Sequence, residues 1–442
     1  MSFARYERYK DSGVEWLGEV PVHWEVKRLR FVAELNPSKN EIAKLDRDIE
    51  VSFLPMEAVG DDGSLNLDRT RSICEVEMGY TYFREGDVTI AKITPCFENG
   101  KGAVMRGLVG GIGFGTTELI VARPYEKQTT SEYLHWLFIS TPFRKLGEAS
   151  MYGAGGQKRM PDDFVSNFSI AFPPREEQSA IATFLDRETA KIDALVAEQQ
   201  RLIELLKEKR QTVISHAVTK GLNLDARMKD SGIEWLGEVP AHWEVKRLKY
   251  IGKAIGGLIY DPSEIVEVGY GTLVLRSSNV QNGSIVFDDN VYVTTTIPEN
   301  LITQNGDILV CSRNGSRALI GKNAMIDSES SGLTFGAFMM IFRSEYSGYI
   351  FHVFNSQLFK FQSGAFLTAT INQLTIGNLY SMEVPLPPIC EQPTIATFLN
   401  RENAKFDALI AETNTAITLL QERRTALISA AVTGKIHVCG LI

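Results

Sequence analysis

The chain is internally duplicated, and no other feature constrains its fold as strongly. The stretch at residues 11–29, DSGVEWLGEVPVHWEVKRL, returns at residues 230–248 as DSGIEWLGEVPAHWEVKRL. A second stretch, PPREEQSAIATFLDRETAKIDALVAEQ from Pro173, returns as PPICEQPTIATFLNRENAKFDALIAET from Pro387. Repeats of this quality indicate two copies of one structural unit.

The segments between these repeats are mostly unlike. Residues 30–172 and 249–386 share only short echoes, such as the Gly-Asp pairs at 86–87 and 306–307. The chain therefore keeps a repeated frame constant and changes the inserts that the frame carries. This organisation suits the reading of two different targets at a fixed separation, so we expect a bipartite, asymmetric target.

Each segment that opens with two prolines predicts a long helix. Proline fits the first helical positions, and acidic residues such as Glu176, Glu177 and Glu391 favour the positive end of the helix dipole. Both segments then run for many turns without Gly, and the only later proline, Pro393, should shift the start of the second helix by a few residues at most. Roughly 40 residues at 1.5 Å each give a helix of about 60 Å.

Steps of three and four residues along both segments predict an apolar coiled-coil seam. We expect the two helices to pair antiparallel, which would relate the copies by a pseudo-twofold axis and put the globular domains at opposite ends. The predicted seam consists of Ile181, Leu185, Glu188, Ile192, Leu195, Gln199, Leu202, Leu206, Lys209 and Val213, and of Ile395, Leu399, Glu402, Phe406, Leu409, Thr413, Ala416, Leu420, Arg423 and Leu427.

The inserts predict mixed α/β structure. Strand-like runs follow the Gly-Asp pairs, at 87–91 and 306–311, and dense apolar faces predict helices at 131–138 and 349–354. The fold class is therefore α+β, with two mixed α/β globular domains separated by two long antiparallel coiled-coil helices. The predicted boundaries are 1–172 and 219–386 for the domains, 173–218 and 387–432 for the helices, and 433–442 for a C-terminal tail.

Cationic and amide side chains gather after each Gly-Asp strand. Arg and Lys can pair with guanine, and Asn with adenine, in the major groove of DNA. A further basic cluster follows the glycine run at 153–156, whose mobility would suit docking on a duplex. The alternative for each residue is a solvated surface charge. We predict DNA contacts from Lys92, Thr94, Asn99, Lys101, Lys158 and Arg159 in the first copy, and from Arg276, Arg313, Asn314 and Arg317 in the second.

Aromatic and basic residues of the frame have a different predicted role. An identical residue in both copies is a poor reader of two different sequences, so we expect the repeated tryptophans to anchor the core and the other residues to belong to the frame. The tryptophans are Trp16/Trp235 and Trp24/Trp243, and the other residues are His23/His242, Lys27-Arg28 and Lys246-Arg247.

Composition narrows the class of protein. With 44% hydrophobic and 23% charged residues, the chain should bury a sizeable core. Its five cysteines form no C-x-x-C pair, and neither a secretion signal nor an apolar run of about 18 residues occurs, so a cytoplasmic protein without a zinc cluster is expected. The net charge of −8 opposes DNA binding unless basic residues share one surface or partner subunits help to enclose the duplex.

The sequence contains no complete catalytic motif of the classes considered below. The nearest approach to a P-loop, from Gly315 to Asn323, has the wrong spacing and ends in Asn instead of Ser or Thr. There is no H-E-x-x-H, no nuclease-like acidic pattern and no Asn-Pro-Pro-Tyr or Asp-Pro-Pro-Tyr motif of an amino-methyltransferase. We therefore predict a chain without a catalytic site, metal site or cofactor of its own.

The duplicated Pro-Pro-x-x-Glu-Gln openings, the Ile-Ala-Thr-Phe-Leu helices that follow them and the Gly-Asp strands resemble the specificity subunit of type I restriction-modification enzymes. The resemblance covers nearly the whole chain. It implies two target recognition domains that each read one half of a split DNA site, and helices that set the spacer and hold two methyltransferase subunits. It also implies motor-nuclease restriction subunits as partners, with S-adenosylmethionine, ATP and Mg used by the partners.

Two other classes of protein remain as alternatives. A coiled-coil scaffold whose globular domains bind protein would fit the negative charge, and it predicts no sequence-dependent DNA affinity. An enzyme that acts alone on nucleic acid would need a recognisable site, which the sequence lacks.

Overall fold

The computed structural model describes residues 3–154, 156–366 and 372–440. It divides into two compact units. The first unit contains Met1–Gln199 and Thr415–Ile442, and the second contains Gln200–Asn414. Both long helices contribute to both units, since α5 (Arg175–Lys220) and α9 (Gln392–Val432) each begin in one unit and end in the other.

The Pro-Pro-x-x-Glu-Gln openings form the starts of the two helices. In each opening the glutamine side chain turns back, and Nε2 of Gln178 and Gln392 donates to the carbonyl of Pro173 and Pro387, respectively, at 2.9 Å. Pro393 lies in the first turn of α9, as expected for a residue without a backbone N–H.

The two helices run in opposite directions within each unit. In the first unit, Asp193 of α5 pairs with Arg424 of α9, and the N-terminal turn of α5 and the residues just after α9 both contact Trp24. In the second unit, Arg210 of α5 pairs with Asp407 of α9. The predicted antiparallel pairing is confirmed.

The predicted apolar seam is confirmed over much of both helices and is wrong at three positions. Its buried members are Ile181, Leu185, Ile192, Ile395, Leu399, Phe406 and Leu427. Leu195, Leu202 and Leu409 of the predicted seam are 50%, 41% and 46% exposed. Val196 packs against the core instead of Leu195, and Ile203 is buried instead of Leu202. At Leu195-Val196 and Leu202-Ile203 two adjacent residues are apolar, so spacing does not distinguish them, and the surface that faces the helix selected Val196 and Ile203.

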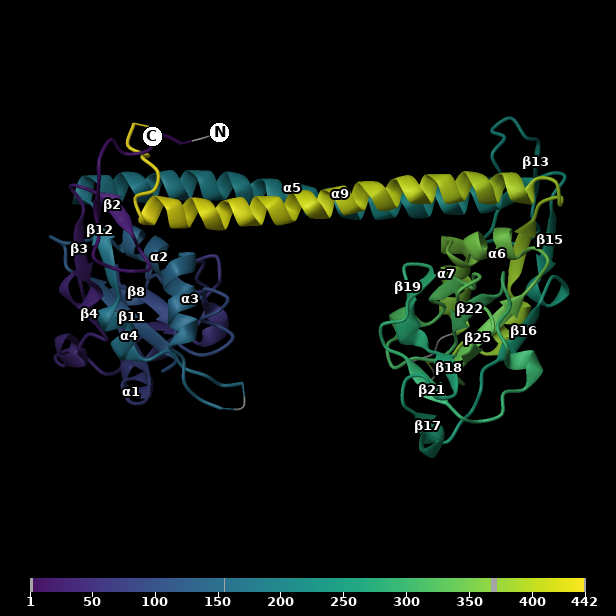
Figure 1. The fold of residues 1–442 in the computed structure, drawn as a ribbon, viewed down its shortest axis with the longest axis horizontal. Coiled ribbons are helices and arrows are strands. Elements are labelled where there is room, and N and C mark those ends of the chain that lie inside the picture. The colour runs from purple at the N-terminus through teal and green to yellow at the C-terminus, as the bar shows by residue number, and fades with distance from the viewer. Residues whose placement is uncertain (1–2, 155, 367–371, 441–442) are drawn as a thin grey trace. The chain divides into compact units, whose positions relative to one another are not determined.

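The first unit contains two four-stranded sheets and two two-stranded ribbons (Figure 1). The sheet orders are β4-β11-β8-β9 and β6-β5-β10-β7, and the ribbons are β1-β2 and β3-β12. Helix α2 packs on β8, β9 and β11. The strands are β1 (Tyr9–Asp11), β2 (Glu19–Pro21), β3 (Glu25–Arg28), β4 (Ala33–Leu35), β5 (Glu50–Leu54), β6 (Thr70–Ser72), β7 (Thr81–Arg84), β8 (Val88–Ala91), β9 (Gly102–Val104), β10 (Ile112–Gly115), β11 (Leu119–Pro124) and β12 (Ser169–Phe172), and the helices are α1 (Ile73–Val76), α2 (Ser131–Ile139), α3 (Thr141–Ala149) and α4 (Asp162–Asn167).

The second unit repeats part of this topology with an unlike sequence. Its sheet β16-β25-β22-β23 corresponds to β4-β11-β8-β9, and a parallel pair occurs in the other large sheet of each unit, β5 with β10 and β18 with β24. The strands are β13 (Met228–Asp230), β14 (Glu238–Pro240), β15 (Glu244–Arg247), β16 (Lys253–Gly256), β17 (Ile265–Val266), β18 (Thr272–Leu275), β19 (Val280–Gln281), β20 (Ser284–Ile285), β21 (Val291–Val293), β22 (Ile308–Cys311), β23 (Asn323–Met325), β24 (Thr334–Phe335), β25 (Met339–Arg343) and β26 (Glu383–Leu386), and the helices are α6 (Ser347–Phe354), α7 (Gln357–Phe366) and α8 (Ile376–Ser381).

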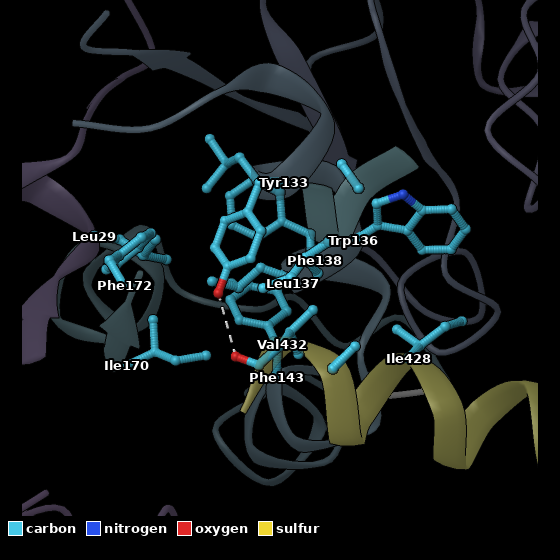
Figure 2. Close-up of a cluster of buried hydrophobic side chains, with 14 of the residues drawn as sticks. Leu29, Tyr133, Trp136, Leu137, Phe138, Phe143, Ile170, Phe172, Ile428 and Val432 are labelled. Carbon is cyan, nitrogen blue, oxygen red and sulfur yellow. Dashed lines mark hydrogen bonds between the residues drawn. The ribbon is translucent and has the colours of Figure 1, made fainter. Parts of the chain in front are cut away.

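The main core of the first unit joins the insert to the frame. Figure 2 shows Tyr133 and Phe138 of α2 close to Val432 at the end of α9. The buried Tyr133 hydroxyl donates to the Val432 carbonyl at 3.3 Å, and in the second unit the Tyr349 hydroxyl donates to the Val218 carbonyl at 2.9 Å. Each variable insert is thereby fixed to the end of a long helix.

The repeated tryptophans divide into two classes. Trp24 and Trp243 are completely buried, which confirms them as core anchors, and Trp16 stacks on Phe168 at a centroid distance of 5.2 Å. The prediction is wrong for Trp235, which is 41% exposed. Its ring lies 5.6 Å from the ring of the exposed Phe361 and so covers a surface side chain instead of filling the core.

No helix in the described part of the chain combines the length and the apolar character that crossing a membrane would require.

Candidate nucleic-acid interface

In each unit the glutamate at the start of a long helix contacts the His-Trp pair of the repeated frame, and we call this contact the glutamate-tryptophan clasp. Glu177, at the start of α5, accepts from Nε1 of Trp24 at 3.1 Å and lies 2.8 Å from Nε2 of His23. Glu391 makes the same contacts, with Nε1 of Trp243 at 3.1 Å and Nε2 of His242 at 2.6 Å. The repeated His-Trp pair and the glutamate of the Pro-Pro-x-x-Glu-Gln opening are therefore partners, which sequence spacing did not indicate.

A glycine after each helix completes the clasp. Gly221 follows α5 and Gly434 follows α9, both with positive φ, at 76° and 71°. A Cβ at Gly221 would lie 3.1 Å from the Trp243 ring, and one at Gly434 would lie 2.5 Å from Pro21. The end of each helix can therefore approach the other copy's frame closely only because these residues are glycine.

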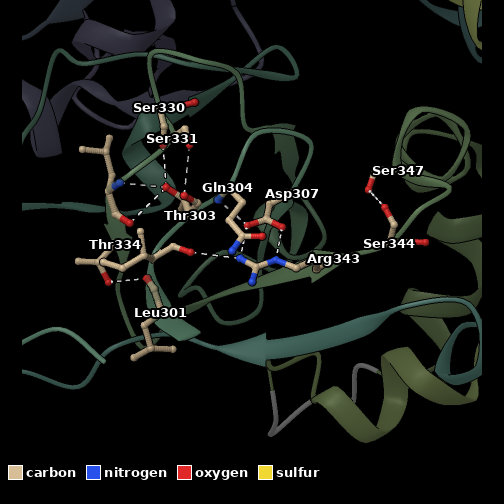
Figure 3. A network of polar contacts seen from close by, with 12 residues as sticks. Leu301, Thr303, Gln304, Asp307, Ser330, Ser331, Thr334, Arg343, Ser344 and Ser347 are labelled. Carbon is tan, nitrogen blue, oxygen red and sulfur yellow. Dashed lines mark hydrogen bonds and ion pairs between the residues drawn. The ribbon is translucent and has the colours of Figure 1, made fainter. Parts of the chain in front are cut away.

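The Gly-Asp pairs support the sheet beneath the candidate loops. Asp87 is 1% exposed, and its two carboxylate oxygens accept from Nε and Nη2 of Arg123 at 2.8 Å. Figure 3 shows the same arrangement in the second unit, where Arg343 donates to both oxygens of Asp307 at 2.7 Å. A buried carboxylate is tolerated when it is paired in this way. The Gly-Asp pair that both copies share therefore fixes the start of strands β8 and β22. The predicted DNA-contacting loops follow the other end of these strands.

Two distant segments meet at the candidate loop of the first unit. Residues 92–101 follow β8, and residues 156–160 return beside them: the Met160 amide donates to the Lys92 carbonyl at 2.8 Å, and the Thr94 amide donates to the Lys158 carbonyl at 3.0 Å. The structure therefore brings Lys92, Thr94, Lys158 and Arg159 together. Residue 155 of the glycine run lies outside the described residues.

Arg159 is held by a carboxylate that the sequence did not single out. Its Nε lies 2.9 Å from Oε2 of Glu118, and its Nη2 lies 2.7 Å from Oε1. Hydrogen bonding with Arg159 lowers the pKa of the Glu118 carboxyl. This pairing orients the guanidinium and also offsets part of its charge. The acceptor-only Glu118 can itself accept from a cytosine amino group.

Of the remaining predicted residues of this loop, some form hydrogen bonds within the protein and others are exposed to solvent. The Lys101 ammonium donates to the Met56 carbonyl at 3.2 Å, and the Thr94 hydroxyl donates to the Gly156 carbonyl at 2.7 Å, so both stabilise the loop. Asn99 and Lys158 have exposed side chains. The latter two are the more accessible candidates for contact with DNA.

In the second unit a cleft gathers three of the four predicted residues. Arg276, Arg313 and Asn314 line it. Arg276 donates to Oδ2 of Asp289 at 2.7 Å, and Arg313 lies over the Phe338 ring at 5.3 Å from its centroid.

The cleft also contains residues that the sequence did not indicate. Phe338 is 58% exposed, and Asn372 and Gln373 add amide groups at the rim. An exposed aromatic ring beside a guanidinium offers apolar contact to a base, such as the methyl group of thymine. The only signal in the sequence was an apolar residue next to the Gly336-Ala337 turn, which is too common to be specific.

Arg317 does not belong to this cleft. It lines a different hollow of the second unit, and its Nη2 donates to the Gly364 carbonyl at 3.1 Å. The loop after β22 therefore divides its cations between two sites. The described residues contain no group of three or more His, Cys, Asp or Glu side chains that could hold a metal ion.

Comparison with known proteins identifies the family. A model described as "Type I restriction modification DNA specificity domain" matches residues 21–205 and 240–419. The specificity subunit of type I restriction enzyme EcoAI from Escherichia coli is 44% identical over 189 residues, which are 42% of this chain and 31% of that protein. The chain thus matches about a third of the length of that relative. A putative MjaX specificity subunit from Methanocaldococcus jannaschii is 23% identical over 453 residues, or 99% of each chain.

Solved structures show the same fold. A chain from a study of complex assembly and conformational transition of the type I R-M system superposes with a TM-score of 0.77 at 17% identity, over 93% of this chain and 98% of that one. The HsdS subunit from Thermoanaerobacter tengcongensis gives a TM-score of 0.57 at 18% identity, over 94% and 98%. Together with the family model, which covers most of both copies, these similarities show that the chain belongs to the type I restriction-modification DNA specificity family.

Proposed function

We propose that this chain selects the DNA site for a type I restriction-modification complex in the cytoplasm. Each unit reads one half of a bipartite, asymmetric DNA sequence. The chain carries no catalytic step itself: two methyltransferase subunits, which use S-adenosylmethionine, modify adenine at the selected site. Motor-nuclease subunits, which use ATP and Mg, cleave DNA that lacks the modification.

One observation carries this proposal. The two units share a four-stranded sheet of the same order and the glutamate-tryptophan clasp, yet the loops that follow β8 and β22 carry different side chains. After β8 the first unit places Lys92 and Thr94 beside Lys158, whereas after β22 the second places Arg313 and Asn314 beside Phe338. Equal scaffolds with unequal loops are what two unlike half-sites require.

The net charge of −8 is compatible with this proposal because the candidate residues are locally basic. Enclosure of the duplex by partner subunits would supply further phosphate contacts. A protein-binding scaffold remains the competing function, and it predicts that the loops do not influence where DNA is modified.

The test is co-expression with a methyltransferase partner and mapping of modified adenines across a genome. We expect one split, asymmetric motif. Exchange of residues 30–172 for the insert of another family member should change one half of the motif, and exchange of residues 249–386 should change only the other half. Random or absent modification, or a change of both halves by one exchange, contradicts the proposal.

A further inference from the structure

A hollow in the second unit lies between the globular insert and the long helices. It is lined by Arg210 and Gln211 of α5, Arg317 of the loop after β22, His352 of α6 and Lys360 of α7, together with side chains of α9. None of these residues belongs to the cleft that contains Arg313. The hollow is therefore a separate feature from the candidate DNA-reading site.

The first unit carries different side chains at the equivalent place. Its α2 carries Trp136 where α6 carries His352, and α5 carries Asp186 where α9 carries Asn400. Nε1 of the buried Trp136 donates to Oδ1 of Asp186 at 2.9 Å. The imidazole ring of His352 is smaller than the indole ring of Trp136, and His352 lines the hollow.

Helix α9, which lines the hollow, also differs from its counterpart α5 at this place. The stretches IATFLDRETAKIDAL and IATFLNRENAKFDAL differ at three positions. Two of the three, Asn400 and Asn403, line the hollow and replace Asp186 and Thr189 of the first copy. The two copies of the frame therefore differ at this place, and the difference removes a carboxylate.

The resulting surface is cationic. Arg210, Arg317, Lys322 and Lys360 line the hollow with a single carboxylate, that of Asp407, which pairs with Arg210. Loss of the carboxylate at position 400 makes the hollow more favourable for an anion than the equivalent place in the first unit.

Two buried polar atoms of this lining have no partner within the described structure. They are Nε of Arg210 and Nδ1 of His352, and His352 is only 1% exposed. Burial lowers the pKa of His352 to about 4, so its ring is neutral at pH 7. The ring contacts the Asn400 side chain and the Ala396 backbone of α9, and the unpartnered Nδ1 can accept a hydrogen bond. Buried unpaired groups of this kind are costly unless something satisfies them.

We propose that this hollow binds a small phosphorylated molecule that also carries hydroxyl or amino donors, of the class of a nucleotide or sugar phosphate. Arg210, Arg317 and Lys360 contact the phosphate group, since guanidinium and ammonium donors form short, charge-assisted bonds to phosphate oxygens. A hydroxyl or amino group of the ligand donates to Nδ1 of His352. Amide side chains such as that of Asn403 add contacts to its polar edges.

The test is calorimetric titration of the full chain with AMP, ribose 5-phosphate and inorganic phosphate. We expect saturable binding of at least one of the two organic phosphates, more tightly than inorganic phosphate. Arg317→Gln and Lys360→Gln should each weaken it about tenfold or more, the effect of losing one charge-assisted bond. Lys145→Gln on α3, the first unit's counterpart of α7, makes the same change of charge on an exposed residue and should have no effect.

A second variant rebuilds the first unit's arrangement in the second. His352→Trp combined with Asn400→Asp should abolish binding without lowering the thermal melting temperature, because that pair already packs in the first unit. Absence of saturable binding for all three probes overturns the proposal, as does binding that these substitutions leave unchanged. If Arg317→Gln and Lys360→Gln weaken only the binding of duplex DNA of arbitrary sequence, the hollow belongs to the DNA path and the proposal is likewise wrong.

Discussion

Nε of Arg424 on α9 donates to Oδ1 of Asp193 on α5 at 2.9 Å. The equivalent residues of the other copies, Arg210 and Asp407, form the reciprocal pair in the second unit. The aspartate of each repeated segment therefore pairs with the arginine of the other, so the two ion pairs follow the internal pseudo-symmetry of the sequence. They favour antiparallel pairing of these helices in the observed register.

This relationship predicts the outcome of a charge reversal. Asp193→Arg places two guanidinium groups together and should lower the free energy of unfolding by about 1 kcal/mol, because the pair is partly exposed. Adding Arg424→Asp should restore most of the loss. Urea denaturation of the single and double variants measures the coupling. Simple additivity of the two single effects would show that the pair does not contribute.

The arginine beneath the candidate loop should matter far more. Arg123→Met leaves the Asp87 carboxylate buried without its main partner and should cost about 3–5 kcal/mol. Asp87→Asn in the same background should recover part of this loss, because it removes the unpaired charge. Thermal unfolding followed by circular dichroism is the measurement, and Arg343→Met with Asp307→Asn is the matched pair in the second unit. An Arg123→Met variant as stable as the parent would contradict the structural role of the Gly-Asp pair.

Acid should destabilise the second unit through His352. Burial lowers the pKa of His352 from 6.5 to about 4, so between these values the unfolded chain binds a proton that the folded chain excludes. Stability from this residue is therefore complete above pH 6.5 and falls as the pH drops toward 4, by up to about 3 kcal/mol. His352→Phe should flatten the fall in urea-derived stability within this window. An unchanged slope would mean that His352 titrates normally in the folded state.

Two arginines of one loop should differ in their effect on DNA selection. Arg313→Ala removes a side chain of the candidate cleft and should weaken discrimination at one position of one half-site by about 1–3 kcal/mol. Arg317 lines the separate hollow, so Arg317→Ala should leave the base preference unchanged. Methylation of a randomised DNA library by the complex containing each variant gives the preference at every position. Equal changes for both variants would show that the cleft and the hollow act as one surface.

Several features of the fold could be predicted from sequence because they depend on local chemistry or on comparison of the two copies. Helical periodicity and proline position predicted α5 and α9, and the repeated Trp24 and Trp243 were identified as anchors. The predicted seam was wrong in placing Leu195 at the core in place of Val196, because both residues are apolar and only the packed surface distinguishes them.

The candidate site could likewise be predicted only in part from the sequence. Position after the Gly-Asp strand singled out Arg313 and Arg317, and position after the glycine run singled out Arg159, but neither could reveal the Glu118 carboxylate that holds Arg159. Nor could position show that Arg313 and Arg317, four residues apart, line different hollows.

The sequence by itself determined that this protein consists of two copies of one frame with unlike inserts, because repetition is visible without any knowledge of folding. Only the tertiary structure decided which side chains meet. Glu177 reaches Trp24 across 153 residues of chain, and His352 borders a hollow whereas its counterpart Trp136 donates to Asp186. Such contacts arise from the packing of distant segments, and packing depends on the shape of both partners, which no single stretch of sequence contains.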